Sequence, residues 1–475
     1  MFRRKPLANL VLLALPLSAL ANQPAELDAA ALAERLLRLE QRLGIESGQT
    51  DDGREDSLAS LTHRLAELES RLDQQEASVA KAASNATVTV DHRGFAARSP
   101  EGGFEIRVRG GIHLDNRRFI DDDPVVDNGG FLFRRIRPTL EGSLGPLAAF
   151  RITPELAGDT VTLQDAWVDL RFSPAATLRV GKMKSPIGLE RLQSLSAIAL
   201  VERGFPTELA PNRDVGAQLQ GALYGGRVSY QLGLFNGTVD GRSSAARDAD
   251  NEREVSARIF FEPWKGAVHP LAGLGFGIAA SHGDKEGAGN AFLPRYRSPG
   301  QATFFNYRST VFADGEHTRI SPQAYYYAGA FGIQAEYIRS EQKLGLTSAP
   351  EAGQKLDNSA WQVTAGWVLT GETAAYSGTI NPNQPFEPGK GGWGAFELVG
   401  RYGELSIDDD AFPLFANKDA AAEKAEAWGI GLNWHLNRNV KLVFNHTQSR
   451  FDGGAANGAD RDTEKTFFSR LQLAF

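Results

Sequence analysis

Most of the sequence consists of short segments in which apolar and polar residues alternate. In the last segment Phe467, Leu471 and Phe475 would share one face of a strand, whereas Arg470 and Gln472 would lie on the other. A period of two predicts β-strands with one apolar face. Sixteen segments follow this pattern, and they are residues 104–115, 130–144, 147–157, 161–172, 176–184, 213–224, 226–237, 253–263, 271–282, 318–327, 330–341, 358–370, 392–405, 424–436, 438–449 and 464–475. Their lengths are close to the ~9–11 residues of a tilted membrane strand.

The connections between these segments alternate between short and long. Tight turns are indicated at 145–146, 173–175, 225–226, 328–329 and 437–438, and long polar stretches at 185–212, 237–252, 283–317 and 406–423. The segment 371–391 is an exception, because it is long where a short turn is due. Short turns at one end and long loops at the other are typical of outer-membrane barrels. Because unpaired backbone cannot face lipid, we expect an all-β, closed antiparallel transmembrane barrel. A secreted soluble β-protein is the alternative.

The N-terminus carries the features of an export signal. Arg3, Arg4 and Lys5 precede an apolar run, and Ala19-Leu20-Ala21 forms a small-x-small cleavage site. We expect three parts: a signal peptide (1–21), a periplasmic helical or coiled-coil segment with a linker (22–90), and the barrel (91–475). With no cysteine in the chain, disulfide scaffolds and thiolate metal sites are excluded. The expected location is the outer membrane of a Gram-negative cell, in contact with its lipids and lipopolysaccharide.

Leucines in the segment 22–90 recur at heptad spacing. Leu32, Leu36, Leu39 and Leu43 form one run, and Leu58, Leu61, Leu65, Leu68 and Leu72 form another. So narrow an apolar stripe favours an oligomerising coiled coil. The alternative is an amphipathic helix that lies on its own domain.

Charge and motifs limit the functions that this chain can have. With 51 basic and 58 acidic residues the net charge is -7, so nonspecific nucleic-acid binding is disfavoured. The sequence has neither GxSxG nor HExxH, and we expect no enzyme activity, no cofactor and no metal site. Asp460, Asp462 and Glu464 could bind Ca²⁺ weakly, but a solvated loop is the simpler interpretation. A barrel enzyme would need a clustered Ser/His/acid set.

Basic residues fall on strand faces that should line a lumen. In 130–144, Arg135 and Arg137 alternate with Ile136 and Pro138, and lipid-facing arginine is costly at mid-depth. Arg151 follows the same rule in the next strand. An arginine-lined lumen would select anions, since the guanidinium fork donates two hydrogen bonds to phosphate. The alternative is that these arginines pair with lumen acids such as Asp165, Asp169 and Glu141, which would leave a general porin with weak anion preference.

Several short motifs resemble the phosphate-selective porin family (porins O and P). They occur in order between about 104 and 475, and they are Phe133-Arg134-Arg135, GKMKSPIGLER (181–191), Val201-Glu202-Arg203, Leu369-Thr370-Gly371-Glu372, Trp393-Gly394-Ala395-Phe396-Glu397-Leu398 with Arg401-Tyr402, and Gly431-Leu432-Asn433-Trp434 with Asn437. The resemblance implies a sixteen-stranded homotrimeric porin whose third loop folds into the lumen. It also implies passive uptake of phosphate, pyrophosphate or polyphosphate past lumen arginines and lysines.

The resemblance also indicates which residues would contact the anion. The family's basic positions match Arg134, Arg135, Arg191 and Arg203, and less securely Arg295 and Arg297. Together with Arg137 and Arg151 from the strand pattern, these are the candidate substrate-binding residues. The chain departs from the family at Ala149, where other members place a wall lysine; the nearest same-face cation is Arg151.

Overall fold

A computed structural model describes residues 34–39, 58–83, 86–120, 129–376 and 380–475. The predicted signal peptide (1–21), Leu32 and Leu43 lie outside the described residues. The chain divides into two compact units, Met1–Ala86 and Thr87–Phe475. In the described residues, helices with the length and apolarity to cross a membrane are absent.

In the first unit the two leucine runs pack against each other. Residues 34–39 are helical, and helix α2 spans Leu58–Ala83. Leu36 and Leu39 are buried against Leu65 and Leu68, with Leu72 packed at the edge of the cluster. Among the described residues, the heptad leucines are therefore buried against one another within one chain.

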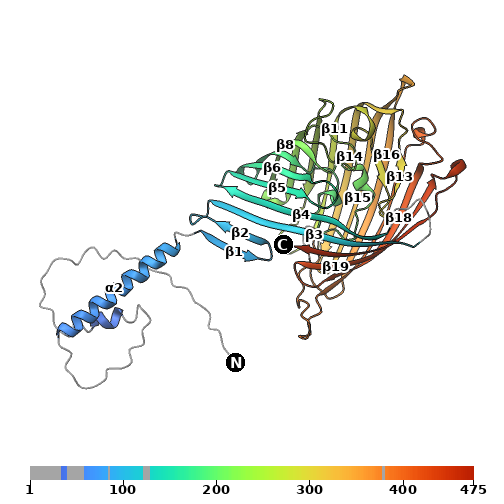
Figure 1. Cartoon of the computed structure of the whole chain (residues 1–475). Helices are drawn as coiled ribbons and strands as arrows, with labels where there is room; N and C mark the ends of the chain where they lie inside the picture. The colour runs from blue at the N-terminus through green and yellow to red at the C-terminus, as the bar shows by residue number, and fades with distance from the viewer. Residues whose placement is uncertain (1–33, 40–57, 84–85, 121–128, 377–379) are drawn as a thin grey trace. The chain divides into compact units, whose positions relative to one another are not determined.

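The second unit is a closed antiparallel barrel, as the alternation predicts (Figure 1). Within the described residues its sixteen strands are β3 (Phe104–Phe119), β4 (Gly130–Leu144), β5 (Ala148–Glu155), β6 (Thr162–Ser173), β7 (Ala176–Met183), β8 (Asp214–Leu223), β9 (Val228–Phe235), β10 (Glu254–Phe261), β11 (Leu274–Ala288), β14 (Val311–Ala328), β15 (Phe331–Leu346), β16 (Ala349–Val368), β17 (Ala395–Ser406), β18 (Ala422–His435), β19 (Val440–Gly453) and β20 (Glu464–Ala474). The last strand pairs with the first, from Thr466↔Phe119 to Ala474↔Gly111, and closes the ring.

Shorter elements occupy the connections and the region before the barrel. They are β1 (Thr87–Asp91), β2 (Gly94–Arg98), α3 (Leu189–Leu192), α4 (Pro206–Leu209), η1 (Tyr224–Gly226), η2 (Gly289–Ala291), β12 (Arg295–Arg297), β13 (Thr303–Asn306), η3 (Asp409–Ala411) and η4 (Ala456–Gly458). β1 and β2 form a hairpin, and β2 pairs with the first part of β3, beyond the point where β20 ends. The sheet is thereby extended at the end of the barrel that holds the tight turns.

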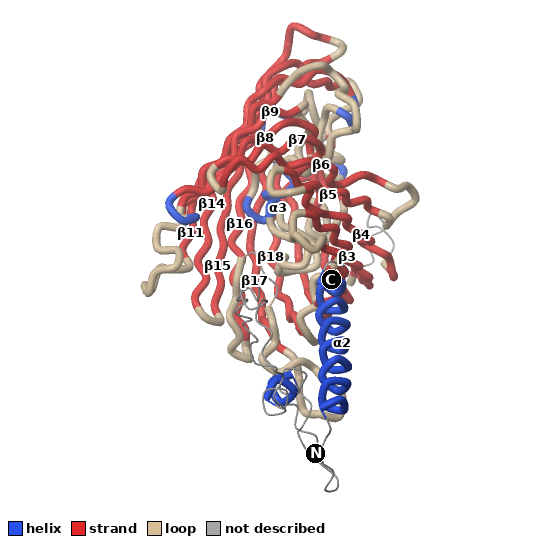
Figure 2. The backbone as a smooth tube through the Cα atoms, turned by 90° about the vertical axis from the view of Figure 1, so that its left-hand side faces the viewer, coloured by secondary structure: helices blue, strands red, loops and turns tan. Residues whose placement is uncertain are grey.

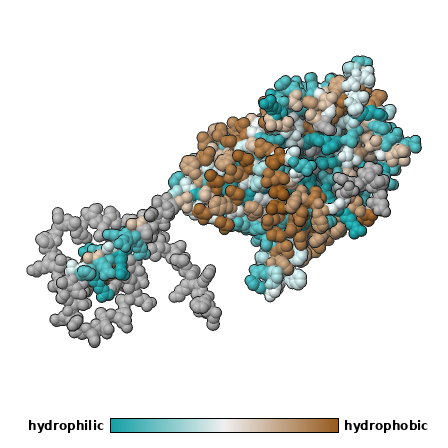
Figure 3. Space-filling model, viewed as in Figure 1, coloured by the Kyte–Doolittle hydropathy of each residue, from teal (hydrophilic) through white to brown (hydrophobic). Residues whose placement is uncertain are grey.

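The alternation separates an apolar outer face from a polar inner face. In β20, Phe467 and Leu471 are 43% and 45% exposed on the outside, while Arg470 and Gln472 are each 2% exposed on the inside. Apolar side chains cover much of the barrel surface visible in Figure 3. This is the surface that a lipid bilayer requires.

Strand lengths differ strongly between the two sides of the barrel. β5, β7, β9 and β10 have 8 residues each, whereas β14, β15 and β16 have 18, 16 and 20. The sequence pattern did not identify 342–357 as strand, yet β15 and β16 continue through this segment to a tight turn between Leu346 and Ala349. This part of β16 begins with mostly exposed residues (Ala349–Gln354), so it lacks the apolar face that marks a strand in the membrane.

The inner side of β14–β19 is covered by connections that fold inward. One hydrophobic cluster joins these strands to the connections 184–213, 289–310 and 407–421, through residues such as Ile187, Phe205, Leu209, Tyr296, Phe304, Phe305 and Phe415. From the opposite end, the connection 369–394, called the long turn below, packs Ala374 and Ile380 against Val368 and Ala395. Figure 2 shows α3 and its loop inside the ring of strands.

Candidate functional site

A cavity of about 520 Å³ lies along the inner face of β3–β9. It is bounded by the third outer connection, residues 184–213 (the third loop below), through Leu192, Ser194, Leu195 and Ser196. At the turn end it reaches the C-terminal Phe475. Because the inward connections cover β14–β19, this cavity is the open part of the lumen that the described residues line.

The charge of the described lining residues is strongly positive. Asp165 is the acidic residue among them, and the basic residues are Arg93, Arg109, Arg135, Arg137, Arg151, Arg179, Lys184, Arg213 and Arg438. In a chain with net charge -7, the described lining of this cavity therefore carries an excess of basic side chains. Such clustering of one sign raises the local concentration of counter-ions in a narrow, low-dielectric space.

Several lumen arginines form ion pairs, including those that the alternative from the sequence named. Arg151 Nη2 lies 2.6 Å from Glu141, Arg179 Nε 2.7 Å from Asp169, and Arg213 Nε 3.3 Å from Asp165. Arg137 Nε lies 2.6 Å from a glutamate at the loop end of β5, Glu155. These pairs fix the side chains and reduce the net field on this wall.

A second group of cations is held by neutral oxygens. Lys182 Nζ donates to the carbonyl of Ser244 at 2.7 Å, and Lys184 Nζ donates to those of Leu192 and Gln193 at 3.2 and 2.8 Å. Arg203 donates to the carbonyls of Glu190 and Gln193 at 2.9 and 3.1 Å. The hydrogen-bond partners of these three cations are therefore uncharged, in contrast to the ion pairs of the wall.

Arg191, a candidate residue from the family resemblance, is not among the described residues that line this cavity. Its guanidinium donates to the carbonyl of Thr207 and, at 3.2 Å, to Asn212 Oδ1, and the side chain is buried. Burial, with Arg203 nearby, lowers the pKa of Arg191 to about 9, so the group remains protonated at neutral pH. We therefore expect Arg191 to act on an anion in the lumen only at long range.

Arg134 and Arg135 both face the third loop although they are consecutive. The pairing register of β3 with β4 shifts between His113 and Leu114, which is a β-bulge opposite these arginines. Arg134 Nε donates to Glu202 Oε1 at 2.6 Å, and Arg135 Nη2 lies 4.0 Å from Glu202 Oε2. Burial opposes ionisation of Glu202, but Arg134 and Arg135 outweigh it and hold the pKa of this carboxyl well below its usual range.

The third loop is anchored on the opposite side of the barrel. Glu336 of β15 accepts hydrogen bonds from the backbone N–H groups of Leu189 and Glu190 at 2.6 and 3.2 Å. Arg401 of β17 pairs with the Glu190 carboxylate, and Gln362 donates to both glutamates at 2.9 Å. These bonds fix the position of α3 across the lumen, and with it the carbonyls that hold Arg203.

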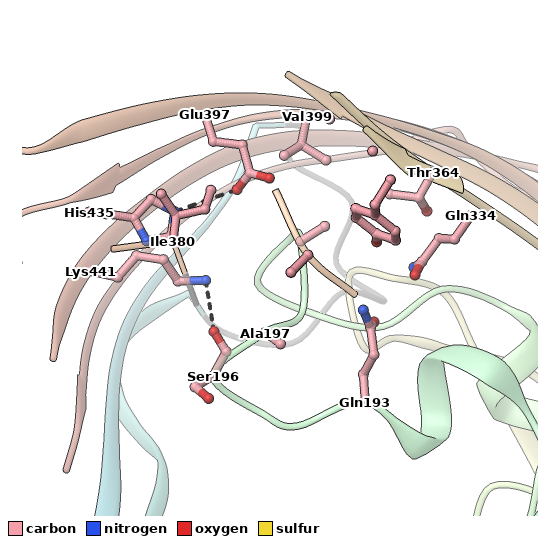
Figure 4. A pocket seen from close by; sticks show the side chains of 15 residues that line it. Gln193, Ser196, Ala197, Gln334, Thr364, Ile380, Glu397, Val399, His435 and Lys441 are labelled. Atoms are coloured by element: carbon pink, nitrogen blue, oxygen red, sulfur yellow. Dashed lines mark hydrogen bonds and ion pairs between the residues drawn. The ribbon is translucent and has the colours of Figure 1, made fainter. Parts of the chain in front are cut away.

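The long turn supports the third loop from the turn end. Tyr376 Oη donates to the carbonyl of Leu189 at 2.6 Å, and Gln193 Nε2 donates to that of Tyr376 at 2.9 Å. A small polar cavity of about 40 Å³ remains between them (Figure 4), where Lys441 Nζ lies 3.3 Å from the carbonyl of Ser196. The third loop and the long turn therefore contact each other inside this side of the barrel.

The remaining candidate residues lie at the loop end or on the wall. Arg295 is exposed in β12, and Arg297 Nε lies 3.6 Å from Glu208 of the third loop. Ala149 is buried on the lumen face of β5, and Arg151 follows two residues later on the same face. We expect Arg295 and Arg297 to act at the outer mouth rather than at the narrow part of the lumen.

The list of candidate residues from the sequence omitted several lumen cations. Arg179, Lys184 and Arg213 line the cavity, and their charges were visible in the sequence without a reason to rank them. Trp167 was also missed; the Arg179 guanidinium lies 3.7 Å from its ring centroid, a cation–π contact. Trp167 alternates with Asp165 and Asp169, so the period of two places all three on the lumen face of one strand. This pattern could have identified it.

Comparison with known proteins agrees with this architecture. A family model described as phosphate-selective porin O and P matches residues 106–475. Porin O of Pseudomonas aeruginosa is 23% identical over 403 residues, covering 78% of this chain and 89% of that protein. A protein of Caulobacter vibrioides described as uncharacterized is 25% identical over 385 residues, covering 78% of this chain and 74% of that protein. The outer membrane channel DcaP of Acinetobacter baumannii has a TM-score of 0.51 at 12% identity, covering 80% and 99% of the two chains, which shows a shared fold.

Proposed function

The chain belongs to the phosphate-selective porin O and P family, and from this premise we propose that it carries out the passive uptake of phosphate, pyrophosphate or polyphosphate. As a porin of this family it is an outer-membrane channel and not an enzyme. The third loop narrows the channel, and the arginines and lysines of the lumen bind the anion in passing.

The observation that carries this proposal is the charge of the cavity on β3–β9. Its described lining contains nine arginines and lysines and the single carboxylate of Asp165. Several weak sites in series allow an anion both to enter and to leave. Lys184 supports this interpretation, because its side chain lines the cavity and is held by the carbonyls of Leu192 and Gln193.

The ion pairs favour a second candidate, a general diffusion porin with weak anion preference. Arg137, Arg151, Arg179 and Arg213 each have a carboxylate partner. If these ion pairs neutralised most of the positive charge of the lumen, small cations and anions would pass at similar rates. The neutral partners of Lys182, Lys184 and Arg203 argue for the selective channel.

The reversal potential of a single reconstituted channel in a KCl gradient separates the two candidates. We expect anions to permeate clearly better than cations, and phosphate and pyrophosphate to block the chloride current. A permeability ratio near one, with no block by phosphate, would identify a general diffusion porin.

We further propose that three copies associate through their barrel walls, with the N-terminal unit in the periplasm. Since the leucine cluster of Leu36, Leu39, Leu65 and Leu68 is closed within one chain, the barrel walls should provide the main contact. Deleting residues 26–82 should leave a folded trimer that dissociates at a lower temperature, because we propose that the part of α2 (Leu58–Ala83) outside this cluster also contacts the other copies. Gel mobility of unheated and progressively heated samples measures this, and identical behaviour of both forms would refute the helical contribution.

A further inference from the structure

Four arginines surround the carboxylate of Glu202 in the third loop. Arg117 Nη2 donates to Oε1 at 2.7 Å, and Arg134 donates to Oε1 and Oε2 at 2.6 and 3.1 Å. Arg135 Nη2 and Arg470 Nη2 lie 4.0 and 3.8 Å from the same carboxylate. The arginines come from β3, β4 and β20, so three strands of the wall converge on one side chain of the loop.

The cluster keeps an excess of positive charge. Asp115 is its second acid and pairs with Arg470 at 2.6 and 2.8 Å. Four guanidinium groups against two carboxylates leave a net charge of +2. Glu202 and Arg135 are 6% and 5% exposed, so water screens this excess poorly.

Two N–H donors of the cluster also lack a hydrogen-bond acceptor among the described residues. The Nε–H groups of Arg117 and Arg135 are buried and have no hydrogen-bond partner among the described residues. Arg135 lines the open cavity on β3–β9 as well, with His113 beside it. Of the four arginines of the cluster, Arg135 is the one that lines this cavity among the described residues.

Converging guanidinium forks around an oxyanion are the arrangement by which arginine clusters bind phosphate. We propose that Arg117, Arg134, Arg135 and Arg470 form a binding site for a free oxyanion of the phosphate type, and that Glu202 is a tethered anion which occupies this site. A passing oxyanion competes with the Glu202 carboxylate for Arg134 and Arg135. This inference rests on the proposed function, because it assumes that such anions enter the lumen.

The tethered carboxylate weakens the site for free anions. A side chain held beside its arginines has a high effective concentration, so it lowers the apparent affinity for a competing ligand without any change in the arginines. Conduction needs this lower affinity, because a site that holds its ion too tightly releases it too slowly. Glu202 thus allows four arginines to face one site without trapping phosphate there.

The test is the saturation of single-channel conductance with inorganic phosphate in the full-length porin. Glu202→Gln keeps the shape but removes the competing charge, and we expect the half-saturating phosphate concentration to fall roughly tenfold and the maximal phosphate conductance to fall with it. Glu202→Asp withdraws the carboxylate by one methylene, so an intermediate fall is expected. Glu423→Gln, which removes an exposed carboxylate paired with Lys418 at 2.8 Å, should behave as the wild type.

The outcomes distinguish the inference from the proposed function. If the wild-type conductance does not saturate with phosphate and shows no anion preference, the proposed function fails. If the wild type saturates but Glu202→Gln leaves the half-saturating concentration unchanged or raises it, the tethered-anion role is refuted. Heat-dependent gel mobility shows which variants fold, and should Glu202→Gln not fold, an unchanged value in Glu202→Asp refutes the role equally.

Discussion

Replacing Arg319 by methionine should lower the free energy of unfolding by about 3–5 kcal/mol, the cost of leaving buried charges without their partner. Arg319 of β14 is fully buried. It donates to Asp240 at 2.6 Å, to Glu254 at 2.8 Å and to the carbonyl of Thr238 at 2.7 Å. Without the guanidinium, two carboxylates would remain inside the barrel unpaired. Equilibrium urea unfolding in phospholipid vesicles, followed by tryptophan fluorescence, measures the loss.

A matched control is available on the neighbouring strand. Arg339 of β15 pairs with Asp357 at 2.6 Å, but its side chain is 48% exposed, and Arg339→Met should cost less than about 1 kcal/mol. Combining Arg319→Met with Asp240→Asn and Glu254→Gln should recover part of the loss, because no charge is then left unpaired. Equal destabilisation by Arg319→Met and Arg339→Met would contradict this account.

The buried ion pairs of Arg319 with Asp240 and Glu254 also predict that acid lowers the stability of the fold. Burial raises the pKa of Asp240, but Arg319 more than offsets it and lowers the value from 3.8 to about 2. Since the folded pKa lies below the unfolded one, this carboxylate stabilises the fold fully above about pH 4. The contribution disappears as the pH falls through 2. In the variant Asp240→Asn this part of the pH dependence should be missing from unfolding curves measured at pH 2 to 5.

Arg203→Ala should weaken phosphate block of the chloride current by about 1–2 kcal/mol, the scale of a charge-assisted hydrogen bond. The hydrogen bonds of Arg203 go to carbonyls, so its removal subtracts one positive charge from the third loop. The Debye length of ~10 Å at 0.1 M salt is comparable to a pore radius, and screening across the lumen is weak. The anion-to-cation permeability ratio should fall in parallel.

Two further variants control for position. Arg191→Ala should act in the same direction but less, because Arg191 is buried against Thr207 and Asn212. Lys418→Ala should have no effect, since Lys418 is exposed at the loop end and pairs with Glu423 at 2.8 Å. If all three variants reduced the block equally, selectivity would come from the overall field of the protein and not from the third loop.

The alternation was sufficient to predict the barrel because each membrane strand must show one face to lipid. It failed for 342–357, since beyond the bilayer neither face of a strand has to be apolar. It also could not explain why Arg134 and Arg135 both turn inward. Two consecutive residues share a face only where the register slips, and the slip opposite His113 and Leu114 depends on the partner strand.

The sequence also could not predict which cations pair with which carboxylates. The arginines of the lumen and the acids Asp165, Asp169 and Glu141 could be listed from the strand pattern, but which cations stay uncompensated depends on contacts between distant segments. Lys184, for example, is oriented by carbonyls of the third loop itself. The role of 369–394 depends in the same way on Tyr376 meeting Leu189.

The inward connections on β14–β19 make the conducting path eccentric. Under the proposed function, an anion would travel beside the arginines of β3–β9 instead of along the axis of the barrel. We would then expect the gap between the third loop and this wall, and not the number of strands, to set the largest solute that passes. In this arrangement a hydrated ion in the cavity would lie close to the basic side chains of one wall rather than at equal distance from all sixteen strands.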